Sequence, residues 1–142
     1  MIWFDASLES PADDGLLQRC IAEMLSISTE SVDVVHSIGE MKDALVTCVA
    51  DAHSAERYSQ LITLYISEEL PRPDVPEAAA RLAQTLDRSL LLVNDETANP
   101  YSFIHVSSTG ERSVVLVDPD ELDENDRYVV RESSRGDDQL ST

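Results

Sequence analysis

The sequence contains few of the residues that catalytic and nucleotide-binding motifs require. Its 142 residues include three histidines and only four glycines, Gly15, Gly39, Gly110 and Gly136. This distribution excludes a glycine-rich loop that cradles phosphate groups. No serine lies in a Gly-x-Ser-x-Gly turn, and no second histidine follows His53 at the spacing of a zinc-binding helix. We therefore predict that the chain is not an enzyme and that it holds neither a metal nor a cofactor.

Cysteine is too scarce to form a disulfide framework. Cys20 and Cys48 stand among apolar residues, where we expect buried free thiols. Free thiols are typical of a reducing compartment, so the predicted location is cytoplasmic. The N-terminal residues contain no basic segment followed by a long apolar run. Neither a signal peptide nor a membrane-spanning segment is therefore predicted.

Positive charge is scarce as well. The chain has 28 acidic and 10 basic residues, a formal net charge of −18, and Lys42 is its single lysine. A charge of about 2–8 is enough to keep a small domain in solution. A strongly negative surface repels nucleic acid and anionic membranes, and it attracts cationic macromolecules. The composition therefore predicts a basic protein as the partner and excludes nucleic acid and membrane.

Hydrophobic residues, at 42% of the chain, are frequent enough for a folded domain in spite of the charge. We assign residues 1–131 to a single domain and the polar residues 132–142 to a flexible C-terminal tail. Short apolar runs and alternating patterns predict strands at 2–4, 32–38, 44–50, 61–67, 90–93, 101–107 and 113–117. Residues 128–130 are a candidate for a further short strand.

Two helices are predicted from their start signals and apolar stripes. Ser10 can cap the first helix and Pro11 suits its first position, and apolar residues then recur along one face as far as Leu25. The second helix begins after Asp74, which forms a capping-box pattern with Glu77, and it covers residues 75–86. Both stripes favour burial against a sheet.

These elements follow the order β-α-β-β-β-α-β-β-β, which is typical of an α+β domain with a mainly antiparallel sheet and two helices on one face. The connections between the strands at 32–38, 44–50 and 61–67 are short, so we expect these three strands to form an antiparallel meander. Gly110 supplies the tight turn between the last two strands of the order.

The sharpest local feature is an acidic run from Asp118 to Asp126, with six carboxylates in nine residues. Three interpretations are open for this run: a cation-binding loop, a solvated loop, and an electrostatic contact surface. A calcium loop of the EF-hand type requires an oxygen ligand at position 5 and a glycine at position 6. Counted from Asp118, these positions hold Leu122 and Asp123, so a dedicated calcium loop is not predicted.

The acidic run and its neighbours supply the predicted partner-binding residues. Tyr128 joins them because interfaces concentrate binding energy in tryptophan, tyrosine and arginine. Other acidic pairs fall where strands are predicted to end, and exposed recognition residues often lie at such positions. The predicted set is Asp118, Asp120, Glu121, Asp123, Glu124, Asp126, Tyr128, Glu68, Glu69, Asp95 and Glu96.

A small, lysine-poor, strongly acidic α+β domain of this layout resembles the immunity proteins of bacterial toxin systems. The resemblance implies that the chain neutralises a basic toxin domain by binding it. An alternative from another class is a chaperone or regulatory adaptor for a secreted effector, and such proteins are commonly dimeric. An exposed apolar patch or a free sheet edge would favour this alternative. A small hydrolase is a third interpretation, and it would require a pocket with perturbed carboxylates.

Overall fold

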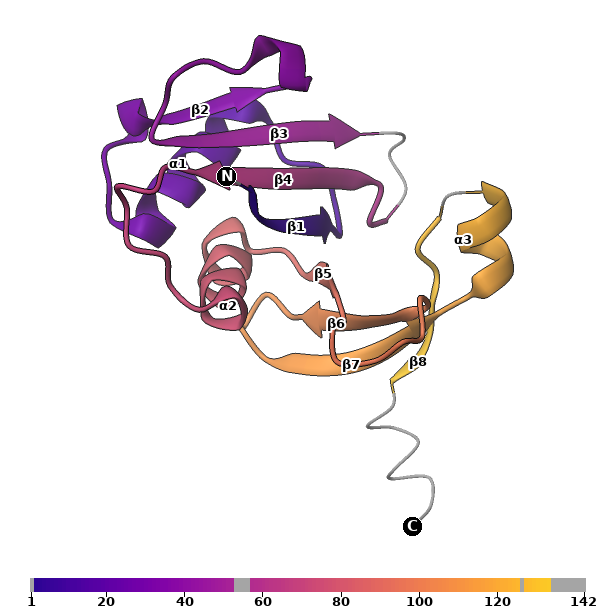
Figure 1. Ribbon diagram of the computed structural model, residues 1–142. Helices are drawn as coiled ribbons and strands as arrows, with labels where there is room; N and C mark the ends of the chain where they lie inside the picture. Colours follow the sequence, from indigo (N-terminus) through magenta and orange to yellow (C-terminus); the bar gives the residue numbers. More distant parts are fainter. Residues whose placement is uncertain (1, 53–56, 126, 134–142) are drawn as a thin grey trace.

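The computed structural model describes residues 2–52, 57–125 and 127–133. An eight-stranded sheet forms its centre, in the order β2-β3-β4-β1-β5-β6-β7-β8 (Figure 1). The strands are β1 (Ile2–Leu8), β2 (Val32–Val35), β3 (Val46–Ala52), β4 (Gln60–Ile66), β5 (Leu90–Val93), β6 (Ser102–Val106), β7 (Arg112–Val117) and β8 (Val130–Ser133). The helices are α1 (Asp14–Leu25), α2 (Val75–Leu86) and α3 (Pro119–Asn125), with two 3-10 turns, η1 (Thr29–Ser31) and η2 (Ile38–Glu40).

The fold is α+β with a mainly antiparallel sheet. Helices α1 and α2 bury their apolar stripes in one core on the same face of the sheet. Ile21 and Leu82 are both fully buried there, at 0% exposure. The order differs from the predicted one because a third helix, α3, follows β7, and because β8 is an eighth strand. Strand β8 also extends to Ser133, two residues into the segment predicted as a tail; residues 134–142 lie outside the described part.

The predicted start of the first helix is wrong by one turn. Asp13 is the N-cap of α1, and its side chain accepts a hydrogen bond of 2.8 Å from the backbone N–H of Leu16. The chain before it stays extended because the buried Gln60 side chain holds both backbone groups of Ala12, at 2.7 and 3.0 Å. This bridge across the fold prevents Ser10 and Pro11 from starting the helix.

The predicted antiparallel meander is correct for β3 and β4 but wrong for β2, which pairs with β3 in parallel. The chain leaves β2 after Val35, where His36 binds the carbonyl of Ala50 at 3.1 Å and the carboxylate of Asp14 at 2.9 Å. The following segment contains η2 and returns the chain to the starting end of β2. Residues 36–45 form this return, because a parallel pairing cannot be closed by a hairpin turn.

Two further local predictions need correction. Strand β1 runs on to Leu8, well beyond the predicted residues 2–4, because it pairs with β4 as far as Gln60. Asp74 is the N-cap of α2, but its side chain caps no backbone group, and Glu77 instead pairs with Arg81 at 2.9 Å. The predicted capping box is therefore absent, while the helix itself has the expected bounds.

The tight turn at Gly110 is confirmed. Its φ of +90° lies in the region that favours glycine, and the backbone N–H of Gly110 donates to the carbonyl of Ser107 at 2.8 Å. A Cβ atom at this position would meet the side chain of Gln84 at 2.6 Å. Gln84 in turn donates a hydrogen bond of 2.8 Å to the carbonyl of Thr109, so the turn is fixed against α2.

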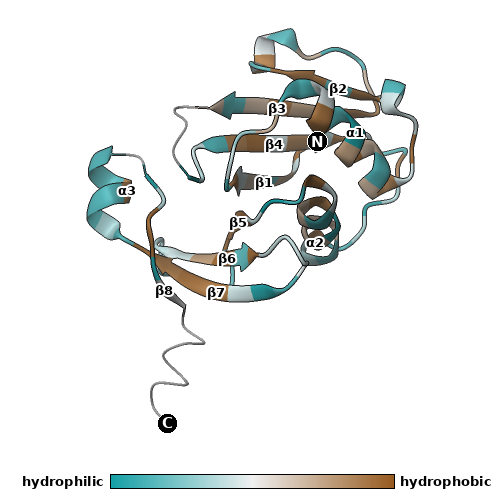
Figure 2. Cartoon of the chain, turned by 180° about the vertical axis from the view of Figure 1, so that it is seen from behind, coloured by the Kyte–Doolittle hydropathy of each residue, from teal (hydrophilic) through white to brown (hydrophobic). Residues whose placement is uncertain are grey.

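The second half of the sheet carries a smaller core on the face opposite to α1 and α2. Phe103 pairs with Val115 across β6 and β7, and both side chains point to this face. Leu122 of α3 and Tyr128 pack against them. The hydropathy colouring shows the result, since α3 is mainly hydrophilic while the strands beside it are hydrophobic (Figure 2). The hairpin is thus covered on both faces, as its sequence requires.

Replacing Ile21 with aspartate should prevent folding. The substitution buries an unpaired charge in the main core, which costs more than about 4 kcal/mol. Replacing the exposed neighbour Glu23 with alanine on the same helix should change the free energy of unfolding by less than about 0.5 kcal/mol. Circular dichroism with urea titration measures both. A native-like Ile21→Asp protein would show that α1 presents a different face to the sheet.

Candidate functional site

The acidic run predicted as a loop forms the helix α3, which begins at Pro119. Asp118 starts it, because its carboxylate accepts hydrogen bonds from the backbone N–H groups of Asp120 at 2.9 Å and Glu121 at 3.2 Å. Its carbonyl accepts from Leu122 at 3.1 Å. The Asp118 side chain therefore caps the N-terminus of α3. The described residues of the run therefore form a helix and not a loop, and Asp120 and Glu124 are exposed on it.

Two more acidic residues of the run are held by internal partners. The carboxylate of Glu121 receives hydrogen bonds from the Arg127 guanidinium at 2.7 and 2.9 Å and from Asn125 at 3.0 Å. The Arg127 hydrogen bond lowers the pKa of Glu121 below its usual value. The phenol of Tyr101 donates to Asp123 at 2.6 Å, and this bond raises the pKa of Tyr101. The Asp123 contact joins α3 to Tyr101 directly before β6, whereas the Glu121 contacts stay within α3 and the segment that follows it.

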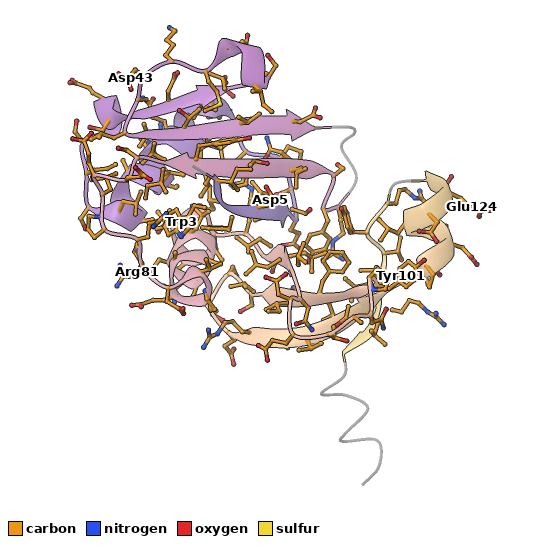
Figure 3. All side chains as sticks on the ribbon, viewed as in Figure 1. Trp3, Asp5, Asp43, Arg81, Tyr101 and Glu124 are labelled. Atoms are coloured by element: carbon orange, nitrogen blue, oxygen red, sulfur yellow. The ribbon has the colours of Figure 1, made fainter. Side chains whose placement is uncertain are left out.

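Asp120 and Glu124 remain exposed. Neither side chain makes a hydrogen bond or an ion pair with any residue that the structure describes. Glu124 lies on the outer side of α3, away from the sheet, while Tyr101 lies beneath the helix (Figure 3). The structure thus divides the predicted acidic set into residues that hold α3 in place and residues that α3 presents to solvent. Asp126 lies outside the described residues.

A concavity of about 760 Å³ lies beside α3, on the same face of the sheet as the smaller core. Its aliphatic and aromatic residues form a mainly apolar surface, and Tyr128 stands edge-on to Phe103 with ring centroids 5.3 Å apart. Val129 and Val130 are 41% and 39% exposed. The lining consists of Arg57, Tyr58, His105, Ser113, Val115, Arg127, Tyr128, Val129 and Val130. We call it the α3 pocket.

Arg57 and Tyr58 both line the α3 pocket, and Tyr58 has an uncommon backbone conformation. Tyr58 is buried and has a φ of +61°, which costs a non-glycine residue roughly 1–3 kcal/mol. Its backbone N–H donates to the carbonyl of Glu9 at 3.2 Å. The Arg57 guanidinium pairs with the Glu9 carboxylate at 2.8 Å and lies over the Tyr58 ring, 5.6 Å from its centroid. Glu9 therefore holds this conformation in place from β1.

The cationic side chains of the α3 pocket already have anionic partners. Arg57 is paired with Glu9, and Arg127 with Glu121. Burial alone would raise the pKa of Glu9, but hydrogen bonds from the Ser89 backbone and from Arg57 lower it below its usual value. The pocket wall is thus close to neutral, whereas helix α3, which precedes the lining residue Arg127 in the chain, carries exposed acidic residues. This arrangement suits an apolar group flanked by positive charge better than it suits an anion.

His105 and Ser113 face each other across β6 and β7 and both line the α3 pocket. The His105 ring stands edge-on to Tyr58, with centroids 6.4 Å apart, and burial lowers its pKa. No hydrogen bond joins His105 to Ser113 within the described residues. A nucleophile and its base normally lie within hydrogen-bond reach of each other. The arrangement therefore offers aromatic and polar contacts for binding, without an activated serine.

The other predicted residues lie away from α3. Glu68 and Glu69 follow β4 in a turn, where Ser67 accepts a hydrogen bond from the backbone N–H of Glu69 at 3.2 Å. Asp95 and Glu96 follow β5 and line a different cavity. The structure therefore does not bring the three acidic groups into one site. All four of these side chains are exposed.

Among the described residues, no three histidine, cysteine or acidic side chains converge as metal ligands. None of the described helices has the length and hydrophobicity needed to cross a bilayer. Cys20 and Cys48 are buried free thiols, as predicted, and burial raises the pKa of Cys48 to about 12. Such a thiol stays protonated at neutral pH and is a poor nucleophile.

Comparison with protein-family models, with curated proteins and with solved structures yields no match. The function must therefore be argued from the geometry of this chain.

No local pattern marked Arg57, Tyr58, His105 and Arg127 as members of a common site. They come from separate connections and strands, which the strand order β4-β1-β5-β6-β7-β8 brings together. The positive φ of Tyr58 has no sequence signal, since tyrosine rarely adopts it. An arginine directly before a tyrosine in both 57–58 and 127–128 is the one pattern that could have drawn attention.

His105 should titrate below the ordinary histidine value of 6.5, because burial disfavours the charged ring. Stability from the neutral ring is then fully present above that value and is lost as the pH falls through the lower pKa of the folded state. Between neutral and mildly acidic pH, the free energy of unfolding should therefore fall less for the His105→Gln variant than for the wild type. NMR titration of the ring protons measures the pKa directly.

His36 provides an internal control for this titration. Its hydrogen bond to Asp14 raises its pKa, so the two histidines should move in opposite directions from the ordinary value. An ordinary or raised pKa for His105 would show that its ring is solvated and that the floor of the α3 pocket is open to water.

Proposed function

We propose that the chain is an acidic protein-binding module that neutralises a basic partner, with an immunity protein that inhibits a cognate toxin as the leading form. One observation carries the proposal. Helix α3 uses Asp118, Glu121 and Asp123 for internal hydrogen bonds and leaves Asp120 and Glu124 exposed, while residues 127–130, which directly follow the helix, line an apolar pocket. Exposed charge and a concave apolar surface thus belong to neighbouring segments of the chain.

The two parts of this surface have different physical roles. Exposed carboxylates accelerate the encounter with a cationic partner. This effect on the association rate weakens as salt rises, because dissolved ions screen charges that act through solvent. A concave surface of valine, tyrosine and arginine can hold a side chain of the partner and slow its release. The net charge of −18 adds a field that favours basic proteins over nucleic acid or anionic membrane. In this proposal the chain acts in the cytoplasm.

A second candidate function is a chaperone or adaptor for a secreted effector, acting as a dimer. The free outer edges of β2 and β8 favour it, because each pairs with a single neighbouring strand within the described residues. Such edges can pair with a second copy or with an extended segment. Analytical sedimentation distinguishes the two candidate functions, because an immunity protein is expected to be a monomer before it binds its partner, whereas the chaperone or adaptor is expected to be a dimer.

A small hydrolase is the weakest candidate. Two described carboxylates have shifted pKa values, and both shifts are downward: hydrogen bonds from the Ser89 backbone and from Arg57 lower the pKa of Glu9, and Arg127 lowers that of Glu121. A general acid near neutral pH requires the opposite shift.

The double variant Asp120→Asn, Glu124→Gln should slow association with the partner roughly three- to tenfold at low salt, because the steering charges are lost. The partner is first obtained by affinity capture from a lysate of the native host and then purified. Stopped-flow mixing measures the association rate. The difference from the wild type should shrink as salt rises.

A matched control removes the same charge elsewhere. Glu30→Gln with Asp43→Asn also neutralises two exposed acidic residues, but on the side of the fold that carries η1 and η2. This control should associate nearly as fast as the wild type. Capture of no basic protein, or equal slowing by both variants, would contradict the proposal that α3 is the contact surface.

A further inference from the structure

The sheet is open between β1 and β5. Strand β1 pairs with β4 from Ile2 to Leu8, but it pairs with β5 only at Ser7 and Leu8. The first five residues of β1 therefore have no ladder on the β5 side. The register of β1 with β4 also shifts between Ile2 and Phe4, and a bulge of this kind increases the local twist of a strand. The two strands thus diverge from a shared point.

A cavity of about 430 Å³ occupies this opening. We call it the β1–β5 groove. Its wall is mainly apolar, and Ile2 and Val93 at its mouth are 57% and 59% exposed. Large apolar side chains with such exposure, next to a strand edge that lacks a ladder partner, indicate a surface that a partner covers. The lining residues are Ile2, Trp3, Phe4, Asp5, Val75, Pro76, Leu92, Val93, Asp95, Glu96 and Ile104.

The rim of the β1–β5 groove is acidic. Asp5, Asp95 and Glu96 are exposed, and none of their side chains makes a hydrogen bond or an ion pair with a described residue. The turn that carries Glu96 is fixed, because its backbone N–H donates to Asn94 at 3.1 Å and Asn94 donates to Ser102 at 3.0 Å. The groove therefore combines a strand edge without a ladder partner on the β5 side, an apolar wall and three carboxylates that pair with no described cation.

We propose that the β1–β5 groove binds an extended basic segment of a partner protein, which adds to β1 as a strand. Backbone hydrogen bonds to Ile2–Ala6 supply affinity, as in other cases of strand addition. Alternate side chains of a strand point to opposite faces, so apolar ones can enter the groove while lysine or arginine meets the acidic rim. A second copy of this chain is a poor occupant, because its charge of −18 has the same sign as the rim.

This inference does not depend on the proposed role of α3. The groove borders the main core through Phe4, Leu92 and Ile104, whereas α3 covers the smaller core on the opposite face. Trp3 and Glu124 mark the two regions, which lie far apart across the sheet (Figure 3). The two sites can therefore be tested separately.

The single tryptophan of the chain provides a local reporter, because Trp3 lines the groove. The probe is a capped seven-residue peptide of alternating lysine and valine, the length of β1. We expect a saturable change in Trp3 emission with this peptide. A glutamate–valine peptide should give none, and a lysine–valine peptide with a central proline should bind poorly because proline interrupts strand pairing.

Two matched variants locate the binding. Asp5→Asn, Asp95→Asn, Glu96→Gln should weaken the lysine–valine peptide about tenfold, since three exposed ion pairs are lost. Asp120→Asn, Glu124→Gln, Glu30→Gln removes the same charge elsewhere and should leave the affinity unchanged. Both variants alter exposed side chains only, and their folding is checked by circular dichroism.

Several results would overturn the inference: no saturable Trp3 response, equal binding of the glutamate peptide, or tolerance of the central proline. The inference would also be overturned if the α3 control weakened peptide binding as much as the groove variant does. Peptide binding would then result from general attraction by the net charge. Failure of the α3 association experiment alone would leave the groove standing.

Discussion

The arrangement of both proposed binding surfaces depends on a short junction between β1 and β5. Only Ser7 and Leu8 pair with Leu91 and Leu90, and these four residues are almost fully buried. Glu9 extends the junction, since its backbone N–H donates to Ser89 at 2.9 Å and its carboxylate accepts from the Ser89 N–H at 3.2 Å. Because the strands meet here and nowhere else, the sheet bends into two halves (Figure 1).

The bend places a concavity on each side of the junction. The β1–β5 groove opens where β1 leaves β5, next to the start of α2. The α3 pocket lies on the opposite face, and Glu9 links it to the junction by holding Arg57 and Tyr58. Glu9, directly after β1, thus contacts both the β1–β5 junction, through Ser89, and the lining of the α3 pocket, through Arg57 and Tyr58. The β1–β5 groove has carboxylates in its own lining, whereas the exposed carboxylates nearest in sequence to the α3 pocket lie on the helix that precedes Arg127.

The sequence predicted the features that depend on local pattern. The stripes containing Ile21 and Leu82, the strands of the second half and the turn at Gly110 follow from periodicity and glycine conformation. The α+β class followed from their order. The acidic run was misread because six carboxylates in nine residues indicate exposure, while the cap at Asp118 and the apolar contact of Leu122 that support a helix are weak signals in sequence.

Features that depend on distant contacts could not be predicted. The parallel pairing of β2 follows from the turn at His36, and the late start of α1 from Gln60. The separation of β1 from β5 depends on a bulge and on the packing of α2, which no local pattern encodes. The candidate site was therefore predicted in part, as an acidic surface without its pockets or its internal partners.

We propose that this chain works by presenting exposed carboxylates and apolar concavities to a basic protein. Hydrogen–deuterium exchange of the chain alone and in complex with its captured partner tests this proposal. We expect new protection of backbone amides at 120–125 and 127–130 or in the first residues of β1, and unchanged exchange in α1 and β2. Protection confined to α1, η1 and β2, with both concavities unaffected, would contradict it.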